Sequence, residues 1–128
     1  MHQSNLPRLD ADSAVRFHGG FSMYRKTPLL RRNLGARSVF IKDETARMGL
    51  GAFKAIGGTY AVAVLLARAL GLETAEARAL RAAMSARGEA PPTFVCASAG
   101  NHGMAVAAGA QHFGARCRIH LSDTVPQA

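Results

Sequence analysis

Lys54 is the first residue whose type and surroundings suggest chemistry. It is one of three lysines beside thirteen arginines, and it follows a loop that contains Gly49 and Gly51. The residues after it predict a buried helix, so Lys54 should lie near the positive end of the helix dipole and be partly desolvated. Both effects disfavour the ammonium form, and Schiff-base chemistry requires the neutral amine as its nucleophile. On its own, however, this position is more typical of a first-turn lysine that extends to solvent.

A second group of chemically suggestive residues follows a predicted strand and has the sequence SAGNHG, from Ser98 to Gly103. Small residues at such a junction leave backbone N–H groups open to a ligand, and the helix that begins there favours an anion such as a carboxylate. The side chain of Asn101 adds a neutral donor to an oxygen atom. An ordinary helix cap with a glycine-assisted turn has a similar composition, so this signal alone is moderate.

Composition and charge exclude several classes of protein. The chain has 128 residues, of which 48% are hydrophobic and 19% charged, as in an ordinary globular domain. No apolar stretch approaches the roughly 20 residues that span a bilayer, and the start of the sequence has no pattern of a secretory signal. We therefore expect a cytoplasmic protein without a membrane partner. The net charge is +8, but the arginines are scattered, so we do not expect a nucleic-acid partner.

Neither metal nor nucleotide binding is indicated by the spacing of the relevant residues. Cys96 and Cys117 lie in separate apolar segments without CxxC spacing, which predicts two buried free thiols. The five histidines form no HExxH motif and do not pair with the cysteines. The loop before Lys54 fits neither GxxxxGK[ST] nor GxGxxG. We therefore expect no metal site and no nucleotide-binding loop of these two kinds.

The elements that must position these residues alternate along the chain. Residues 1–24 have no clear period and predict an irregular lead-in. The later pattern predicts strands at residues 38–42, 93–97 and 116–121 and helices at residues 54–70, 73–87 and 102–113. This alternation predicts an α/β fold with a parallel sheet and flanking helices. Three strands with an open sheet edge form an incomplete unit, so we interpret residues 1–128 as a truncated piece of a larger domain.

Taken together, the two chemical motifs resemble those of one family. TPL begins at Thr27, KDE at Lys42, FK-x-x-GG at Phe53 and SAGNHG at Ser98, and a strand follows. This order resembles the fold-type II pyridoxal-phosphate-dependent enzymes, the tryptophan-synthase-β-like group that includes threonine dehydratases and cysteine synthases. The resemblance runs from about residue 17 to residue 122. Within the group, the segment KDETARMGLGAFKAIGG is most similar to the diaminopropionate ammonia-lyases.

The resemblance implies a role for each motif residue. Lys54 would form the Schiff base with pyridoxal 5'-phosphate and then act as the base at the substrate Cα. Phe53 would lie near the cofactor ring, and Asn101 would donate a hydrogen bond to its phenolic oxygen. The substrate carboxylate would be bound by the loop that contains Ser98, Ala99, Gly100, Asn101 and His102. The implied reaction is β-elimination from a small amino acid to give a 2-oxo acid and ammonia.

Two departures from the family pattern leave alternatives open. The ammonia-lyases have an aspartate where this chain has Ala99, and the Ser98-Ala99 pair resembles threonine/serine dehydratases instead. The family's phosphate-binding glycine loop and the residue that faces the pyridine nitrogen come later than residue 128. The resemblance therefore predicts the N-terminal portion of a catalytic domain, homodimeric at full length. A remnant without activity of its own is the alternative of another class.

Overall fold

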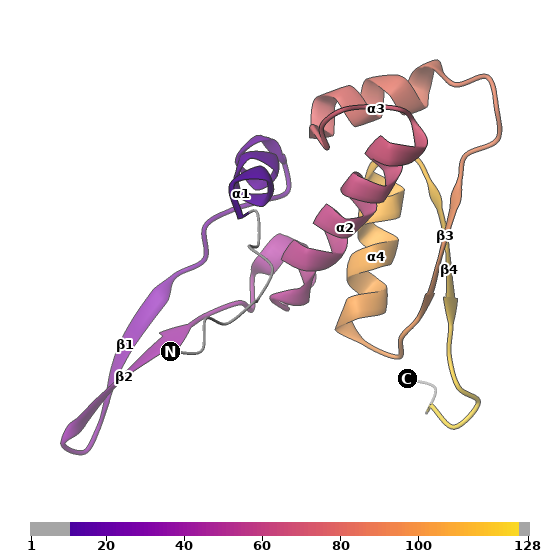
Figure 1. Ribbon diagram of the computed structural model, residues 1–128. Helices are drawn as coiled ribbons and strands as arrows, with labels where there is room; N and C mark the ends of the chain where they lie inside the picture. The colour runs from indigo at the N-terminus through magenta and orange to yellow at the C-terminus, as the bar shows by residue number, and fades with distance from the viewer. Residues whose placement is uncertain (1–10, 126–128) are drawn as a thin grey trace, which may run out of the picture.

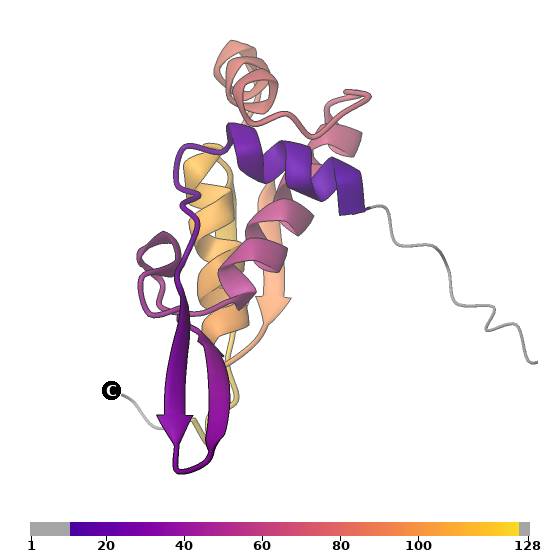
Figure 2. The same ribbon diagram turned by 90° about the vertical axis from the view of Figure 1, so that its left-hand side faces the viewer.

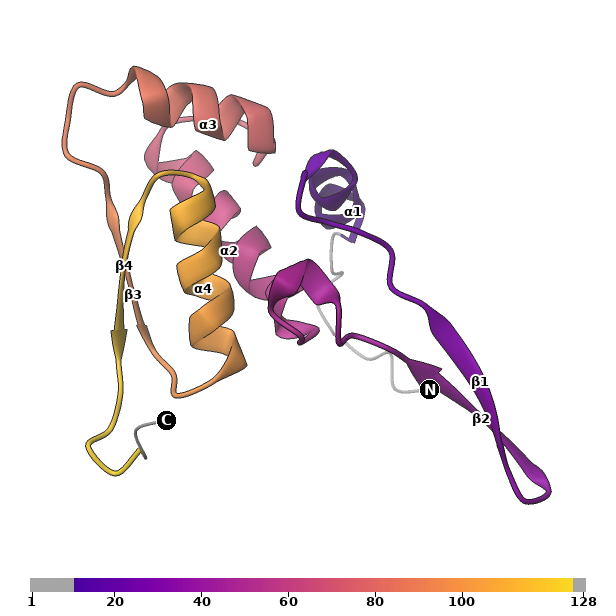
Figure 3. The same ribbon diagram turned by 180° about the vertical axis from the view of Figure 1, so that it is seen from behind.

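The structure, a computed structural model, describes residues 11–125, which form four α-helices, one 3-10 helix and four strands (Figure 1). In chain order these are α1 (Ala11–Gly20), β1 (Leu29–Leu34), β2 (Arg37–Lys42), the 3-10 helix η1 (Arg47–Gly49), α2 (Lys54–Ala69), α3 (Ala77–Ala86), β3 (Thr93–Ala97), α4 (Asn101–His112) and β4 (Arg116–His120). The hairpin β1–β2 projects from a body in which α4 lies between α2 and the strands β3 and β4 (Figures 1 and 3). The predicted α/β class is confirmed.

The two strands β3 and β4 form the parallel sheet that the alternating pattern predicts. Phe94 pairs with Cys117 and Cys96 with Ile119, and α4 connects the strands. These half-buried side chains alternate with exposed ones along both strands. The helix α4 therefore covers one face of the sheet, as a crossover helix in a strand–helix–strand unit does.

The strand predicted at residues 38–42 exists as β2, but it does not belong to this parallel sheet. It pairs antiparallel with β1, from Leu29 opposite Lys42 to Leu34 opposite Arg37, in a separate two-stranded sheet (Figure 2). Gly35 allows the tight turn between them because its φ is 60°. The strand β1 was not predicted, because the segment LLRRNL lacks the alternation of a half-buried strand.

The lead-in predicted to be irregular contains a helix, α1, and this part of the prediction is wrong. Phe17 on α1 and Phe21 just beyond it are buried, and their rings stack at 5.1 Å. Both rings also lie near the ring of Phe113, at 6.4 Å and 6.1 Å. This aromatic contact, between residues far apart in the sequence, buries the helix against the body. Residues 1–10 of the predicted lead-in lie outside the described residues.

The second predicted helix begins later than expected. Its predicted first turn at Glu73 is a loop, and α3 starts at Ala77 after Glu76 in an extended conformation. The acidic residues that were expected in its first turn therefore precede the helix. Leu80 of α3 is fully buried together with Leu66 and Val62 of α2, so apolar packing sets the position of α3 in the body.

The two cysteines are free thiols, as predicted, but they are half-buried where buried thiols were expected. Cys96 and Cys117 lie on neighbouring strands. Burial raises the pKa of the Cys117 thiol, and the neighbouring Cys96 raises it further. Among residues 11–125, no helix has the length and apolar character of a membrane span, and no group of three metal-ligating side chains comes together.

Candidate active site

The site depends on an unusually close approach of α2 and α4. A Cβ atom built on Gly58 would lie 2.5 Å from the Cβ of Ala105, which is closer than real carbon atoms come. A Cβ built on Gly109 would lie 3.1 Å from the Cα of Thr59 and 3.3 Å from the Cβ of Val62. Glycine at positions 58 and 109 therefore lets the two helix backbones pack almost directly against each other.

The same contacts fix the direction and register of the two helices. Gly58 meets Ala105, and further along both helices Val62 meets Gly109, so the helices run in the same direction. Lys54 precedes Gly58 by four residues, and Asn101 precedes Ala105 by four residues. At 1.5 Å of rise per residue, both helix starts lie about 6 Å before the Gly58–Ala105 contact. Lys54 and Asn101 therefore lie at the same end of the helix pair. Figures 1 and 3 show the starts of α2 and α4 at this common end.

The turn before α4 has the geometry of an anion-binding helix start. The N–H of Gly103 donates to Ser98 Oγ at 3.2 Å, and Gly100 precedes the helix without a side-chain cap. A Cβ on Gly103 would lie 2.8 Å from the carbonyl oxygen of Ser98, so the tightness of the turn requires glycine there. Within the described chain, no acceptor binds the N–H groups of Asn101 and His102. These two groups are open to a negatively charged ligand.

Lys54 lies at the first position of α2, as predicted, but its surroundings differ from the prediction. The side chain is exposed, so the expected partial desolvation is not found. No hydrogen bond or ion pair reaches it among residues 11–125, and the first turn of α2 contains no acidic residue. The neighbouring Phe53 is 66% exposed. Within residues 11–125 the amine of Lys54 is therefore not bound to another protein group, and it can bond to a ligand.

The structure thus brings together the motif residues that the sequence separates by more than forty positions. Lys54 and Phe53 lie at the start of α2, and the Ser98–Gly103 turn lies at the start of α4, at the same end of the pair. Ser98 is half-buried, whereas Ala99, Gly100, Asn101 and His102 are exposed. The arrangement offers one free amine, one side-chain amide and two open backbone N–H groups on one surface.

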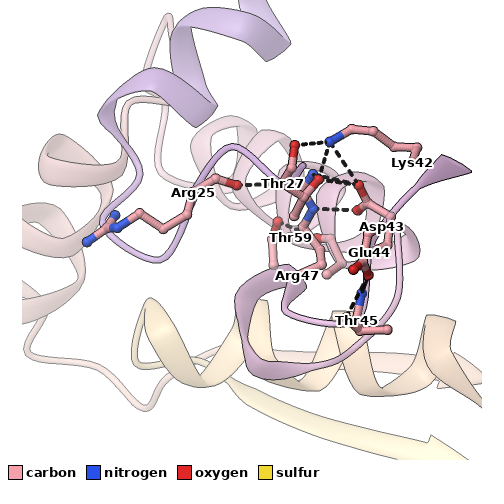
Figure 4. A network of polar contacts seen from close by, with 9 residues as sticks. Arg25, Thr27, Lys42, Asp43, Glu44, Thr45, Arg47 and Thr59 are labelled. Carbon is pink, nitrogen blue, oxygen red and sulfur yellow. Dashed lines mark hydrogen bonds and ion pairs between the residues drawn. The ribbon is translucent and has the colours of Figure 1, made fainter. Parts of the chain in front are cut away.

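A network of polar side chains at the base of the hairpin was not recognised in the sequence. Arg47 is 2% exposed, and its guanidinium donates to both carboxylate oxygens of Glu44, at 2.6 Å and 2.9 Å (Figure 4). It also donates to the carbonyl of Arg25 and to Thr27 Oγ1, both at 2.7 Å. Lys42 binds the hydroxyl and carbonyl of Thr27. The signal in the sequence was the spacing KDE-x-x-R. It places an arginine three residues after Glu44, where a single turn of the backbone brings the two side chains together.

The network lowers the pKa of Glu44 from its ordinary value of 4.5 to about 2, mainly through the hydrogen bonds from Arg47 and then Thr27. A depressed carboxyl pKa stabilises the fold above the pKa of the unfolded chain, and this stabilisation is lost as pH falls through the folded value. We expect Glu44→Gln to lower the free energy of unfolding by a constant amount near neutral pH. The difference in the free energy of unfolding between wild type and Glu44→Gln should then shrink as the pH falls from 4.5 to about 2.

Urea unfolding of both proteins at stepped pH measures this difference. The other carboxyl groups titrate equally in the two chains, so the difference isolates Glu44. If the difference in the free energy of unfolding stayed the same across the acid range, the hydrogen bonds from Arg47 and Thr27 would not act on a charged Glu44.

One cavity of the described chain lies away from this surface. It has a volume of about 560 Å³ and is enclosed by α1, α2 and the loop before α3. Phe17, Tyr60 and Leu72 contribute apolar surface to it, and none of the predicted site residues lines it. The candidate site at the helix starts is therefore separate from this cavity.

The comparison with known proteins defines the class. The chain matches the family described as pyridoxal-phosphate dependent enzyme over residues 16–128, and it belongs to this family. The family resemblance predicted from the motifs is therefore confirmed, and pyridoxal phosphate is the cofactor that the family uses. The free amine of Lys54 suits the aldehyde of this cofactor, and the amide and N–H groups at the start of α4 suit its oxygen atoms or a substrate carboxylate.

The more particular similarity is to diaminopropionate ammonia-lyases. The chain is 37% identical over 118 residues to that enzyme from Escherichia coli K12, which covers 87% of this chain and 29% of the relative. The enzyme from Salmonella typhimurium LT2 is 37% identical over 114 residues. The crystal structure of the holo enzyme from Escherichia coli has a TM-score of 0.79 and 35% identity, covering 91% of this chain and 31% of that one. A structure of the same enzyme in complex with D-serine is equally similar, with a TM-score of 0.79. The chain therefore spans less than a third of the length of these relatives.

Proposed function

We propose that this chain supplies the lysine-bearing part of a pyridoxal-phosphate-dependent ammonia-lyase. The substrate is a small amino acid of the diaminopropionate type, and the products are a 2-oxo acid and ammonia. The observation that carries the proposal is the register of α2 and α4, which places Lys54 and Asn101 at the same end of two parallel helices. The similarity to the ammonia-lyases supports the choice of reaction.

Lys54 has two tasks in this proposal. Its amine binds the cofactor covalently, and after the substrate amine has replaced it, the same amine takes the proton from the substrate Cα. When bound, the cofactor ring serves as the sink for the electrons left by that proton. The exposed position of Lys54 at a helix start, without a salt-bridge partner among residues 11–125, leaves the amine available for both tasks.

The residues at the start of α4 bind the oxygen atoms. Asn101 donates from its side-chain amide to the phenolic oxygen of the cofactor, and Phe53 lies beside the cofactor ring. The substrate carboxylate binds at the helix start, where the open N–H groups and the helix dipole favour an anion. The residues that form this carboxylate-binding turn are Ser98, Ala99, Gly100, Asn101 and His102.

Ala99 sets the expected stereochemistry. An alanine side chain cannot transfer a proton, whereas the ammonia-lyase pattern has an aspartate at this position. We expect the enzyme that carries this sequence to convert L-diaminopropionate and to leave the D-isomer unchanged. Ala99→Asp should create D-turnover, and Ala97→Asp, which adds the same charge two residues earlier at an exposed position of β3, should not.

Formation of 2-oxo acid from L-diaminopropionate, D-diaminopropionate and L-threonine measures these expectations. D-turnover by the unmodified enzyme would contradict the role of Ala99. A higher kcat/KM for L-threonine would contradict the ammonia-lyase assignment and favour the threonine/serine dehydratase, which the Ser98-Ala99 pair also fits. No turnover of any of the three would favour a remnant without activity.

We also infer a homodimer at full length and a cytoplasmic location. The two thiols remain free although Cys96 and Cys117 lie on adjacent strands, and free thiols are usual in a reducing compartment. The dimer rests on the family resemblance, and sedimentation of the protein that carries this sequence tests it.

A further inference from the structure

We propose that Arg47 is a positioning residue for Lys54. In this proposal Arg47 does not touch the cofactor or the substrate. It fixes the loop of residues 45–53, so that Lys54 projects from one defined place at the start of α2. The inference rests on the proposed function of Lys54 and adds a residue that determines how well the lysine performs it.

Arg47 connects the loop to segments that lie far from it in the sequence. Its side chain bonds to Glu44, to Thr27 and to the carbonyl of Arg25, which lies 22 residues earlier. The guanidinium carbon also lies 5.1 Å from the centre of the Tyr24 ring. The arginine therefore contacts both the segment of residues 24–27 and the turn that follows β2, and it holds the loop against them (Figure 4).

The loop between Arg47 and Lys54 requires such an anchor because its backbone turns sharply. Met48 has a φ of 50°, and it is the one non-glycine residue of the described chain in the left-handed region. Gly49 and Gly51 follow with φ of 70° and 66°. The loop's own backbone hydrogen bonds lie at its two ends: the N–H of Leu50 donates to the carbonyl of Arg47 at 2.8 Å, and the carbonyls of Ala52 and Phe53 accept from the first turn of α2 at 3.1 Å. It keeps one conformation only where side chains fix it from outside.

Two side chains at the start of the loop supply that fixation. Met48 is 7% exposed and packs in the hydrophobic core, and Arg47 is held in the polar network. Between Arg47 and Lys54, only Ala52 is also buried, whereas Gly49, Gly51 and Phe53 are exposed. Leu50 is half-buried and packs against the core as well. Loss of the Arg47 contacts would leave these apolar contacts but no polar anchor for a strained loop, and the start of α2 would sample more than one position.

The three directions of hydrogen bonding explain why this residue is arginine. A guanidinium presents five donors in one plane, and here they reach a carboxylate, a hydroxyl and a carbonyl at once. A lysine at the same place keeps the charge but reaches fewer of these acceptors. We therefore expect Arg47→Lys to restore part of the positioning and Arg47→Met to restore none.

The test compares the labelling of Lys54 with that of Lys26, another of the three lysines of the chain, which serves as the internal standard. The protein is incubated with pyridoxal phosphate, reduced with borohydride and digested, and the pyridoxyl label on Lys54 is divided by the label on the exposed Lys26. Wild type, Arg47→Met and Arg47→Lys are compared at a temperature well below their unfolding midpoints. Arg87→Met is the control, because it removes a contact to Glu89 at 2.7 Å just after α3, and the end of α3 lies away from the start of α2 in Figure 1.

We expect Arg47→Met to lower the Lys54-to-Lys26 label ratio about tenfold, since a displacement of about 1 Å has large effects on reaction rates. Arg47→Lys should give an intermediate ratio, and Arg87→Met should leave the ratio unchanged even if it lowers the unfolding midpoint. An unchanged ratio in Arg47→Met, together with a lowered midpoint, would show that Arg47 only stabilises the fold. A wild-type ratio near one would contradict the proposed function of Lys54 itself, and the positioning role with it.

Discussion

Lys54→Ala is expected to lower the kcat of the lyase that carries this sequence by more than about 10³-fold, because one amine serves as both nucleophile and base. The free energy of unfolding should change by less than about 0.5 kcal/mol, since an exposed side chain with few contacts contributes little to stability. Lys54 is exposed and has no hydrogen bond or ion pair within residues 11–125. This variant therefore separates chemistry from folding.

Two controls make the result specific. Lys54→Arg keeps a positive charge at the helix start but removes the nucleophile, so it should be as inactive as the alanine variant. Lys26→Ala removes an exposed lysine from the lead-in and should keep full activity. Formation of 2-oxo acid and the visible absorbance of the bound cofactor are measured for each. If Lys54→Ala kept a substantial part of the activity, another residue would have to supply the amine.

Gly58→Ala should be the most damaging single-methyl change at the helix contact. The added Cβ would lie 2.5 Å from the Cβ of Ala105 and 3.1 Å from the carbonyl carbon of the same residue. Backbone atoms cannot yield as a flexible side chain can, so α2 and α4 must separate. Overpacking of this kind costs about 1–3 kcal/mol. The separation should also lower kcat/KM, because Lys54 and Asn101 lie on the two helices that move apart.

Gly57→Ala is a closely matched control. Gly57 is the preceding residue of the same helix, it is exposed, and a Cβ built on it would meet nothing within 4 Å. Alanine there should stabilise the helix by roughly 0.5–1 kcal/mol. Urea unfolding of the two variants measures the contrast. Equal stability of Gly58→Ala and Gly57→Ala would mean that the two helices do not pack as closely as the structure indicates.

The elements around the site could be predicted because their patterns are local. The helix at residues 54–70 ends at Gly71, and the run TFVCA forms a strand, so the limits of α2 and β3 agree with the prediction within a residue. The start of α4 followed from the small residues of SAGNHG. These signals depend on propensity and period alone.

Other features depend on contacts that a sequence does not display. The strand β1 exists because β2 lies opposite it, and α1 is held by the packing of Phe17 against a ring near the other end of the chain. Arginine is ordinarily exposed, so the burial of Arg47 could not be expected from its type. The alignment of Lys54 with Asn101 follows from the contact between Gly58 and Ala105, which only the structure shows.

The position of the pyridoxyl label after borohydride reduction tests the central assignment most directly. The chain has three lysines, so digestion and mass spectrometry assign the label to one of three peptides. We predict that Lys54 carries most of the label at limiting pyridoxal phosphate, ahead of Lys26 and Lys42. Labelling of Lys26 or Lys42 equal to or above that of Lys54 would contradict the assignment of Lys54 as the cofactor-binding residue.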